Sequence, residues 1–260
     1  MEAIVQVMES TIGARDPYTV GHQQRVTQIA CAIGAEIGLS AEQLRDLRVA
    51  GCLHDLGKVA LPLDILAKPG KLTDLEFAML KTHPQLGYDI LRPLKFPRPI
   101  GQIILQHHER WDGSGYPLGL KGKDILLEAR ILGVADVVEA MCSHRPYRPA
   151  LGLEEALAEL RRHRGKLYDP EVVDVCLKLY DEALAAEERT VPELARQGQP
   201  DPSHISADIL ARSQGAKWNR EKAGDLLGWL RKFPFQSRFL LHSVTASLVG
   251  CMLMLASRGS

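Results

Sequence analysis

Residues 50–62 form an apolar segment that carries three polar side chains, those of His54, Asp55 and Lys58. Burying an imidazole beside an ionised carboxylate costs free energy unless a partner replaces the lost water, and a divalent metal ion suits both groups. For this pair alone, a helix end with a hydrogen-bonded histidine and a capping aspartate is the favoured alternative. The other histidines of the chain decide between the two interpretations.

The chain has nine histidines, and five of them lie within the first 108 residues, in segments with separate sequence signals. These five are His22, His54, His83, His107 and His108. Helical bundles commonly build a metal cluster from inward side chains of several helices. Adding Asp55 and Asp136 gives seven candidate ligands, which is more than one tetrahedral ion needs. We therefore expect two divalent ions that share a bridging ligand.

Apolar residues recur at helical spacing along much of residues 1–184, and no strand alternation is convincing. We predict an all-α fold in which capping boxes at Ser40–Gln43 and Thr73–Glu76 open two of the helices. Residues 16–22 are predicted as a turn that precedes a helix. A long buried helix is predicted around Asp136, and Asp169–Pro170 is expected to open the last helix of the domain.

Length and composition are those of a soluble globular protein, since 45% of the 260 residues are apolar and 25% are charged. The formal net charge of zero argues against binding to a nucleic acid polymer. The five cysteines are odd in number and include no CxxC pair, which indicates neither a disulfide framework nor a zinc ribbon. The N-terminus has early acids and no basic stretch, unlike a signal peptide. We expect a cytoplasmic protein.

The composition of the chain changes near residue 185. We predict one domain over residues 1–184, a linker or partly disordered stretch over 185–217, and a helical tail of unknown role over 218–260. Residues 239–256 form an apolar run of 18 residues, which is the short limit for a membrane span. Because the run contains polar residues and has no second span beside it, we favour a packed or poorly ordered tail over membrane association.

Two motifs carry a resemblance to a known family, HDLGK at residues 54–58 and HHERWDGSGYP at 107–117. Further segments occur in the same order: RDPYTVGH at 15–22, ILAKPGKLT at 65–73, HP at 83–84, RILGVAD at 130–136 and RPYR at 145–148. Over about residues 10–183 the chain resembles the HD-GYP phosphodiesterases, which belong to the HD superfamily of metal-dependent phosphohydrolases. The resemblance implies an HD-type helical bundle with a metal centre in its core.

The resemblance also implies a ligand set. One ion would be held at the positions of His22, His54 and Asp136, and the other at those of His83, His107 and His108. Asp55 would bridge the two. Imidazole and carboxylate ligands suit iron, manganese or zinc, and we expect iron or manganese.

The activity implied by the resemblance is hydrolysis of cyclic di-GMP to pGpG or on to GMP, through a hydroxide that bridges the metals. Two ions lower the pKa of a bridging water and neutralise charge that develops on the phosphate. Asp55 and Lys58 are the expected catalytic residues, and Lys58, Arg145 and Arg148 are expected to bind the substrate phosphates. Alternatively, Lys58 is a cation favoured at a helix C-terminus, and the two arginines are solvated.

One matching motif and two departures from the family pattern bear on what the resemblance implies. Gly115-Tyr116-Pro117 is expected to fix the shape of a loop and to form a surface for protein partners, because none of these residues is a good general base. His144 stands where the family often has an acid, and an exposed polar residue is the favoured interpretation. Glu139 stands where aspartate is common in the family, and its extra methylene is expected to change the hydrogen bonds around the ligands.

The number of metals is predicted from one further position. Some members of the family hold a third ion with a glutamate one helical turn before the first histidine ligand. In this chain Tyr18 stands there, four residues before His22. A neutral phenol is a poor ligand for a hard divalent cation, so we expect a binuclear centre.

Two other functions stay open. The first is a non-hydrolysing sensor or adaptor for cyclic di-GMP, and the seven unaltered ligand positions weigh against it. The second is an HD phosphohydrolase that acts on another nucleotide, and the intact GYP loop weighs against that one.

Overall fold

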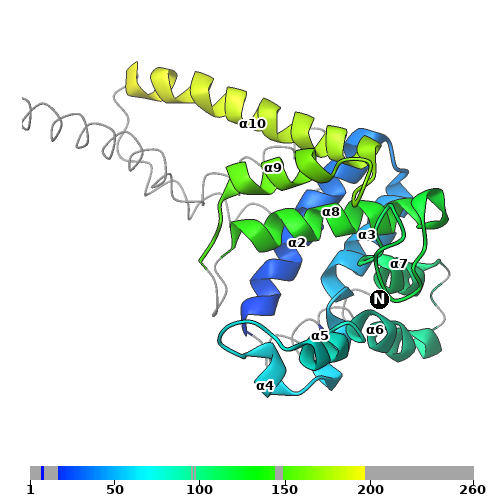
Figure 1. Cartoon of the computed structure of the whole chain (residues 1–260). Helices are drawn as coiled ribbons and strands as arrows, with labels where there is room; N and C mark the ends of the chain where they lie inside the picture. Colours follow the sequence, from blue (N-terminus) through cyan, green and yellow to red (C-terminus); the bar gives the residue numbers. More distant parts are fainter. Residues whose placement is uncertain (1–6, 9–16, 95, 97, 144–148, 197–260) are drawn as a thin grey trace, which may run out of the picture. The chain divides into compact units, whose positions relative to one another are not determined.

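The computed structural model describes residues 7–8, 17–94, 96, 98–143 and 149–196 (Figure 1). The chain divides into two compact units, Met1–Ala207 and Asp208–Ser260, and the described residues all lie in the first. These residues are helical and contain no β-strand, which confirms the all-α prediction for this part of the chain. Within it, no helix combines the length and the apolar character needed to cross a bilayer. The apolar run at 239–256 lies outside the described residues.

The α-helices are α2 (Pro17–Ile37), α3 (Ala41–Leu53), α4 (Leu63–Leu66), α5 (Asp74–Leu80), α6 (His83–Leu91), α7 (Ile100–Gln106), α8 (Leu127–Cys142), α9 (Leu153–His163) and α10 (Pro170–Arg196). Several of them follow one another closely, whereas a longer connection over residues 107–126 joins α7 to α8. Short 3-10 segments are η1 (Leu56–Ala60), η2 (Arg92–Leu94) and η3 (Gly122–Asp124).

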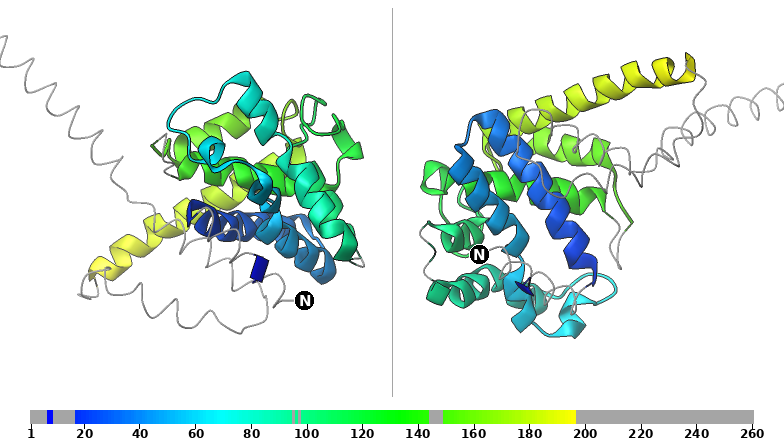
Figure 2. Two further views of the ribbon diagram at one scale, coloured as in Figure 1. Left: turned by 90° about the horizontal axis from the view of Figure 1, so that it is seen from below. Right: turned by 180° about the vertical axis from the view of Figure 1, so that it is seen from behind.

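The core of the bundle forms where α2 packs against both α3 and α8. Figure 2 shows α2 and α3 lying side by side. Fully buried side chains on these helices include Ile29 and Ile33 of α2, Leu47 of α3 and Leu132 of α8. Burying side chains of this size is the main stabilising term for such a bundle. The same packing brings His22 and Asp136, which are 114 residues apart in the sequence, into one interior.

Both predicted capping boxes are present. The Ser40 side chain accepts the backbone N–H of Gln43, and the Gln43 side chain accepts the backbone N–H of Ser40. Thr73 and Glu76 exchange the same pair of hydrogen bonds at the start of α5. Each box satisfies backbone donors that the first helical turn leaves free. The first box fixes where α3 begins, and α3 then ends with His54 as its C-cap residue.

The predicted turn at residues 16–22 is wrong for residues 17–22, because α2 begins at Pro17. Proline suits the first turn of a helix, where its missing N–H has no partner to lose and its fixed φ angle is helical. His22 therefore lies in the second turn of α2 and not at a helix start.

The last helix begins as predicted at Pro170, where the Glu171 N–H donates to the carboxylate of Asp169 at 2.9 Å. It continues to Arg196, so the stretch predicted as a linker from residue 185 begins inside a helix. Residues 185–196 are rich in alanine, glutamate and arginine, which are strong helix formers. The division of the chain into domain, linker and tail stays a prediction.

A close backbone contact positions two parts of the bundle. Segment η1 packs against α6, and a Cβ atom added at Gly57 would lie 1.9 Å from the carbonyl oxygen of His83 and 2.6 Å from the backbone nitrogen of Gly87. Only glycine allows the two backbones to approach so closely. This contact sets Asp55, just before η1, beside His83 at the start of α6.

Candidate metal centre

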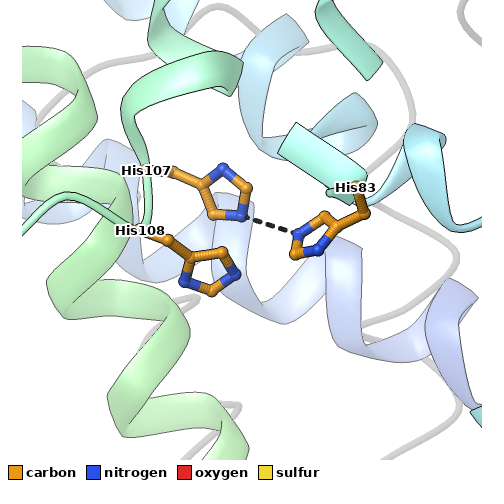
Figure 3. Close-up of side chains that lie close together, drawn as sticks. All are labelled: His83, His107 and His108. Atoms are coloured by element: carbon orange, nitrogen blue, oxygen red, sulfur yellow. Dashed lines mark hydrogen bonds between the residues drawn. The ribbon is translucent and has the colours of Figure 1, made fainter. Parts of the chain in front are cut away.

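All seven predicted ligands lie together in the bundle interior, although they come from five different parts of the chain. His22 is on α2, His54 and Asp55 follow α3, His83 begins α6, His107 and His108 follow α7, and Asp136 is in the middle of α8. Their ligand atoms form groups in which all atoms lie within 4.8 Å of one another. Two of these groups have no member in common: His83, His107 and His108 (Figure 3), and His22, His54 and Asp136.

Asp55 lies between the two groups and is 2% exposed. Its Oδ1 is 3.6 Å from Nε2 of His83, which belongs to the first group. Its Oδ2 is 3.6 Å from Nε2 of His54 and 3.8 Å from Nε2 of His22, which belong to the second. The two oxygens of one buried carboxylate therefore face different groups, which is the arrangement a bridging ligand needs.

Further short distances hold each group together. Nε2 of His22 lies 3.2 Å from Oδ1 of Asp136, and Nε2 of His83 lies 3.4 Å from Nε2 of His107 (Figure 3). Nitrogen atoms of neutral imidazoles do not attract one another at this distance unless a proton or a cation lies between them. The convergence of these atoms is typical of a metal site.

Three of the histidines are oriented by the same local contact. The Nδ1–H group of each donates to the backbone carbonyl three residues earlier: His54 to Gly51 at 2.7 Å, His83 to Leu80 at 2.8 Å and His107 to Ile104 at 2.6 Å. With the proton on Nδ1, the Nε2 lone pair of each ring points into the cluster. A hydrogen bond of this kind fixes the tautomer of a metal-binding histidine.

The donor set fits a divalent cation. Nε2 of His54 is buried and has no hydrogen-bond partner in the part of the chain that the structure describes. A buried acceptor without a partner costs free energy, and a cation would satisfy it. Imidazole and carboxylate ligands together suit iron, manganese or zinc.

The electrostatic environment keeps the first group of imidazoles neutral. Burial lowers the pKa of His83 to about 4 and that of His107 to about 3, and it lowers the pKa of His108 well below its ordinary value. Neutral imidazole is the form that binds a metal, so these rings need lose no proton at neutral pH.

At Asp55 and His22, nearby charges and hydrogen bonds outweigh the effect of burial on the pKa. Although burial opposes it, nearby Lys58 and His54 hold the pKa of Asp55 well below its ordinary value. Against the effect of burial, hydrogen bonds with Asp136 and Glu139 raise the pKa of His22 to about 9. Asp55 is therefore ionised at neutral pH, whereas a metal at Nε2 of His22 would displace a proton.

Lys58 lies at the margin of the cluster. Its ammonium group is 2.7 Å from Oδ2 of Asp55, and its side chain is 19% exposed. The structure thus places Lys58 on the carboxylate that lies between the two ligand groups. The other predicted substrate-binding residues, Arg145 and Arg148, lie outside the described residues, as does His144.

Sequence reasoning singled out Glu139 but missed the residues that hydrogen-bond to it, Arg25 and Ser143. Nδ1 of His22 is hydrogen-bonded to Oε2 of the fully buried Glu139. Oε1 of Glu139 accepts hydrogen bonds from Arg25 Nε at 2.6 Å and from the Ser143 hydroxyl at 2.5 Å. Arg25 lies three residues after His22 and so shares its face of α2, a spacing that could have drawn attention to it.

Comparison with known proteins gives one family match and several relatives. The family described as HD domain matches residues 6–172. The cyclic di-GMP phosphodiesterase response regulator RpfG of Xanthomonas campestris pv. campestris is 46% identical over 166 residues, which cover 63% of this chain and 44% of that protein. The 3′3′-cGAMP-specific phosphodiesterase 2 of Vibrio cholerae serotype O1 is 36% identical over 184 residues, which cover 70% of this chain and 35% of that protein. The chain thus spans less than half the length of these relatives.

A solved structure supports the fold. An HDG"Y"P protein from Bdellovibrio bacteriovorus superposes with a TM-score of 0.52 at 21% identity, over 62% of this chain and 51% of that one. Likeness at this level of identity concerns the helical architecture alone.

Proposed function

Because the chain belongs to the HD domain family, we propose that it is a metal-dependent phosphodiesterase that hydrolyses cyclic di-GMP to pGpG or on to GMP. The observation that carries this proposal is the position of Asp55, whose two carboxylate oxygens face two separate groups of three ligand side chains. A centre of this composition suits two divalent ions, and we propose iron or manganese.

The proposal assigns each ligand to an ion. His22, His54 and Asp136 would hold one ion, and His83, His107 and His108 would hold the other, with Asp55 on both. When bound, such a pair supplies a water nucleophile of lowered pKa and neutralises charge on a phosphodiester.

The other tasks fall to the side chains of the chain itself. The backbone hydrogen bonds of His54, His83 and His107 hold the rings in one tautomer, and the burial of the cluster keeps bulk water away from it. Lys58 places a cation at the margin, where it suits a phosphodiester. Arg145 and Arg148 are proposed as further phosphate contacts on the sequence evidence.

The identity of the substrate rests on the relatives. The one named for cyclic di-GMP is 46% identical to this chain, and the one named for 3′3′-cGAMP is 36% identical. This order supports cyclic di-GMP, and it makes the mixed dinucleotide the competitor that a test must include. A sensor without activity is less well supported, because a module that only binds the nucleotide need not keep seven ligands.

The test is a product analysis with the full chain. Protein purified without oxygen and loaded with Fe²⁺ or Mn²⁺ would be incubated with cyclic di-GMP, 3′3′-cGAMP or cyclic di-AMP, and products would be resolved by chromatography. We expect pGpG or GMP from cyclic di-GMP, and no product from an Asp55→Ala variant. Turnover of 3′3′-cGAMP alone would assign another substrate, and tight binding of cyclic di-GMP without turnover would show a sensor.

A further inference from the structure

The five histidines of the cluster are not all oriented in the same way. Ring hydrogen bonds fix four of them: His22 on Glu139, and His54, His83 and His107 on backbone carbonyls. For His108, no residue in the described part of the chain forms a hydrogen bond with either ring nitrogen. A ligand whose ring turns freely binds a metal less tightly than one that is held. Another contact must therefore orient His108.

That contact comes from Tyr116. Its ring centroid lies 4.9 Å from that of His108, and the two planes are inclined by 30°. The backbone N–H of Tyr116 also donates to the carbonyl of His108 at 3.3 Å. The His107 ring contacts His108 as well, at 4.0 Å and 40°. Tilted aromatic rings in contact at these separations attract each other, and the contact opposes rotation of the smaller ring.

The loop that carries Tyr116 is fixed in place by Glu109. This buried carboxylate is 6% exposed and accepts the backbone N–H groups of Leu118 at 2.7 Å and Leu120 at 3.0 Å. Hydrogen bonds from backbone N–H to an ionised carboxylate are strong in such surroundings. The residue next to His108 in sequence thus ties down the loop whose tyrosine lies on His108.

A glycine allows the loop to fold back so tightly. A Cβ atom added at Gly115 would lie 2.3 Å from the backbone nitrogen of Arg110 and 2.5 Å from Cα of Glu109. No other residue fits there without displacing the backbone. The Lys81 ammonium lies over the Tyr116 ring, 5.4 Å from its centroid. The ring is held by its own loop and by a cation from the end of α5.

We propose that Tyr116 is a positioning residue for His108, and that its ring orients the imidazole by stacking, as hydrogen bonds orient the other four histidines. The inference rests on the proposed function to the extent that His83, His107 and His108 hold an ion. It assigns the role to the aromatic ring and not to the hydroxyl, for which no described residue provides a hydrogen bond.

The test compares three variants by metal content and not by activity alone. Tyr116→Leu removes the flat ring but keeps apolar volume, Tyr116→Phe keeps the ring, and Leu118→Ala is a matched control in the same loop. Leu118 is 53% exposed, and its substitution preserves the backbone bond to Glu109. Folded protein would be equilibrated at a series of free Mn²⁺ concentrations, and bound metal would be measured by mass spectrometry.

We expect Tyr116→Leu to bind one of its two ions at least about tenfold more weakly, in line with the loss of other groups that orient ligands. Tyr116→Phe and Leu118→Ala are expected to bind both ions like the wild type. Should Tyr116→Leu fail to fold, Glu109→Gln replaces it as the test variant. This substitution keeps the size of the side chain but weakens its hydrogen bonds to the loop. We expect a smaller decrease in affinity for the same ion.

Several results would overturn the inference. Unchanged metal affinity in folded Tyr116→Leu would refute it, and if KM alone rose the ring would belong to the substrate. An equal loss in Tyr116→Phe would move the role to the hydroxyl. The proposed function is tested separately. If the wild type binds two ions but hydrolyses no cyclic dinucleotide, the proposed activity is refuted. The comparison of metal binding between the variants still decides the role of Tyr116 in that case. A wild type that binds no metal refutes both.

Discussion

At the scale of single residues, Glu139 connects a candidate ligand to the protein around it. Its buried carboxylate accepts hydrogen bonds from His22 on one oxygen and from Arg25 and Ser143 on the other. The bond to His22 leaves Nε2 of that ring facing the cluster. Arg25, whose side chain is 32% exposed, supplies the opposite charge that a carboxylate needs when it is fully buried.

A Glu139→Gln variant is expected to lower metal affinity by about 10–100-fold, because a neutral amide holds His22 less firmly and leaves Arg25 without its counter-charge. Titration of the metal-free protein with Mn²⁺ measures this loss. Ser143→Ala is the control, since it removes one hydroxyl donor and keeps the carboxylate. Equal affinities for wild type and Glu139→Gln would show that the hydrogen bond is dispensable.

A different result is predicted for Arg145, because the sequence assigns it as a contact to the substrate phosphate and not as a metal ligand. Arg145→Ala is expected to raise KM for cyclic di-GMP by about tenfold or more, as the loss of one charge-assisted hydrogen bond implies. Metal content should stay at the wild-type level. Substrate affinity and metal content would be measured on the same preparation, and an unchanged KM with unchanged turnover would contradict the assignment.

At the scale of elements, the ends of helices supply much of the cluster. His54 and His107 are the C-cap residues of α3 and α7, where carbonyls of the last turn lack helical partners. Their Nδ1–H groups satisfy such carbonyls. The hydrogen bonds that orient these two ligands are thus the same ones that satisfy the carbonyl groups at the helix ends.

This locality explains what the sequence could predict. Capping boxes depend on residues three apart, and the ligand positions lie in short motifs, so both were visible without tertiary structure. The helix start at Pro17 was missed because an Asp-Pro pair occurs at turns as well as at helix starts. The bond between Arg25 and Glu139 joins residues 114 apart in sequence, and no local pattern predicts such a contact.

The contact of η1 with α6 gives a prediction at this scale. Gly57→Ala is expected to destabilise the protein by about 3 kcal/mol, because the new methyl group meets the backbone of α6 and not a side chain that can move. Urea unfolding measures the change. In the control Gly101→Ala, the methyl group meets only the Tyr88 ring, and a change within about 1 kcal/mol is expected. Equal stability of Gly57→Ala and wild type would show that η1 can shift freely.

At the scale of the whole molecule, the candidate metal centre has all seven of its ligands among the described residues. Its ligands lie between His22 and Asp136, and the last described helix ends at Arg196. Deletion of residues 197–260 is therefore expected to leave metal content unchanged and hydrolysis of cyclic di-GMP measurable. A truncated protein with wild-type circular dichroism but without activity would show that the deleted part completes the site.

The spread of the ligands along the chain has a further consequence. An unfolded chain cannot gather donors separated by up to 114 residues, so metal uptake and folding become one linked equilibrium. At a free metal concentration one hundred times Kd, each ion adds about 2.7 kcal/mol to the free energy of unfolding. A chelator is expected to lower Tm by about 5–10 °C per ion, and Asp55→Ala to lose most of this response. In a living cell, the abundance of the folded protein would then follow the supply of the metal as well as the rate of its synthesis.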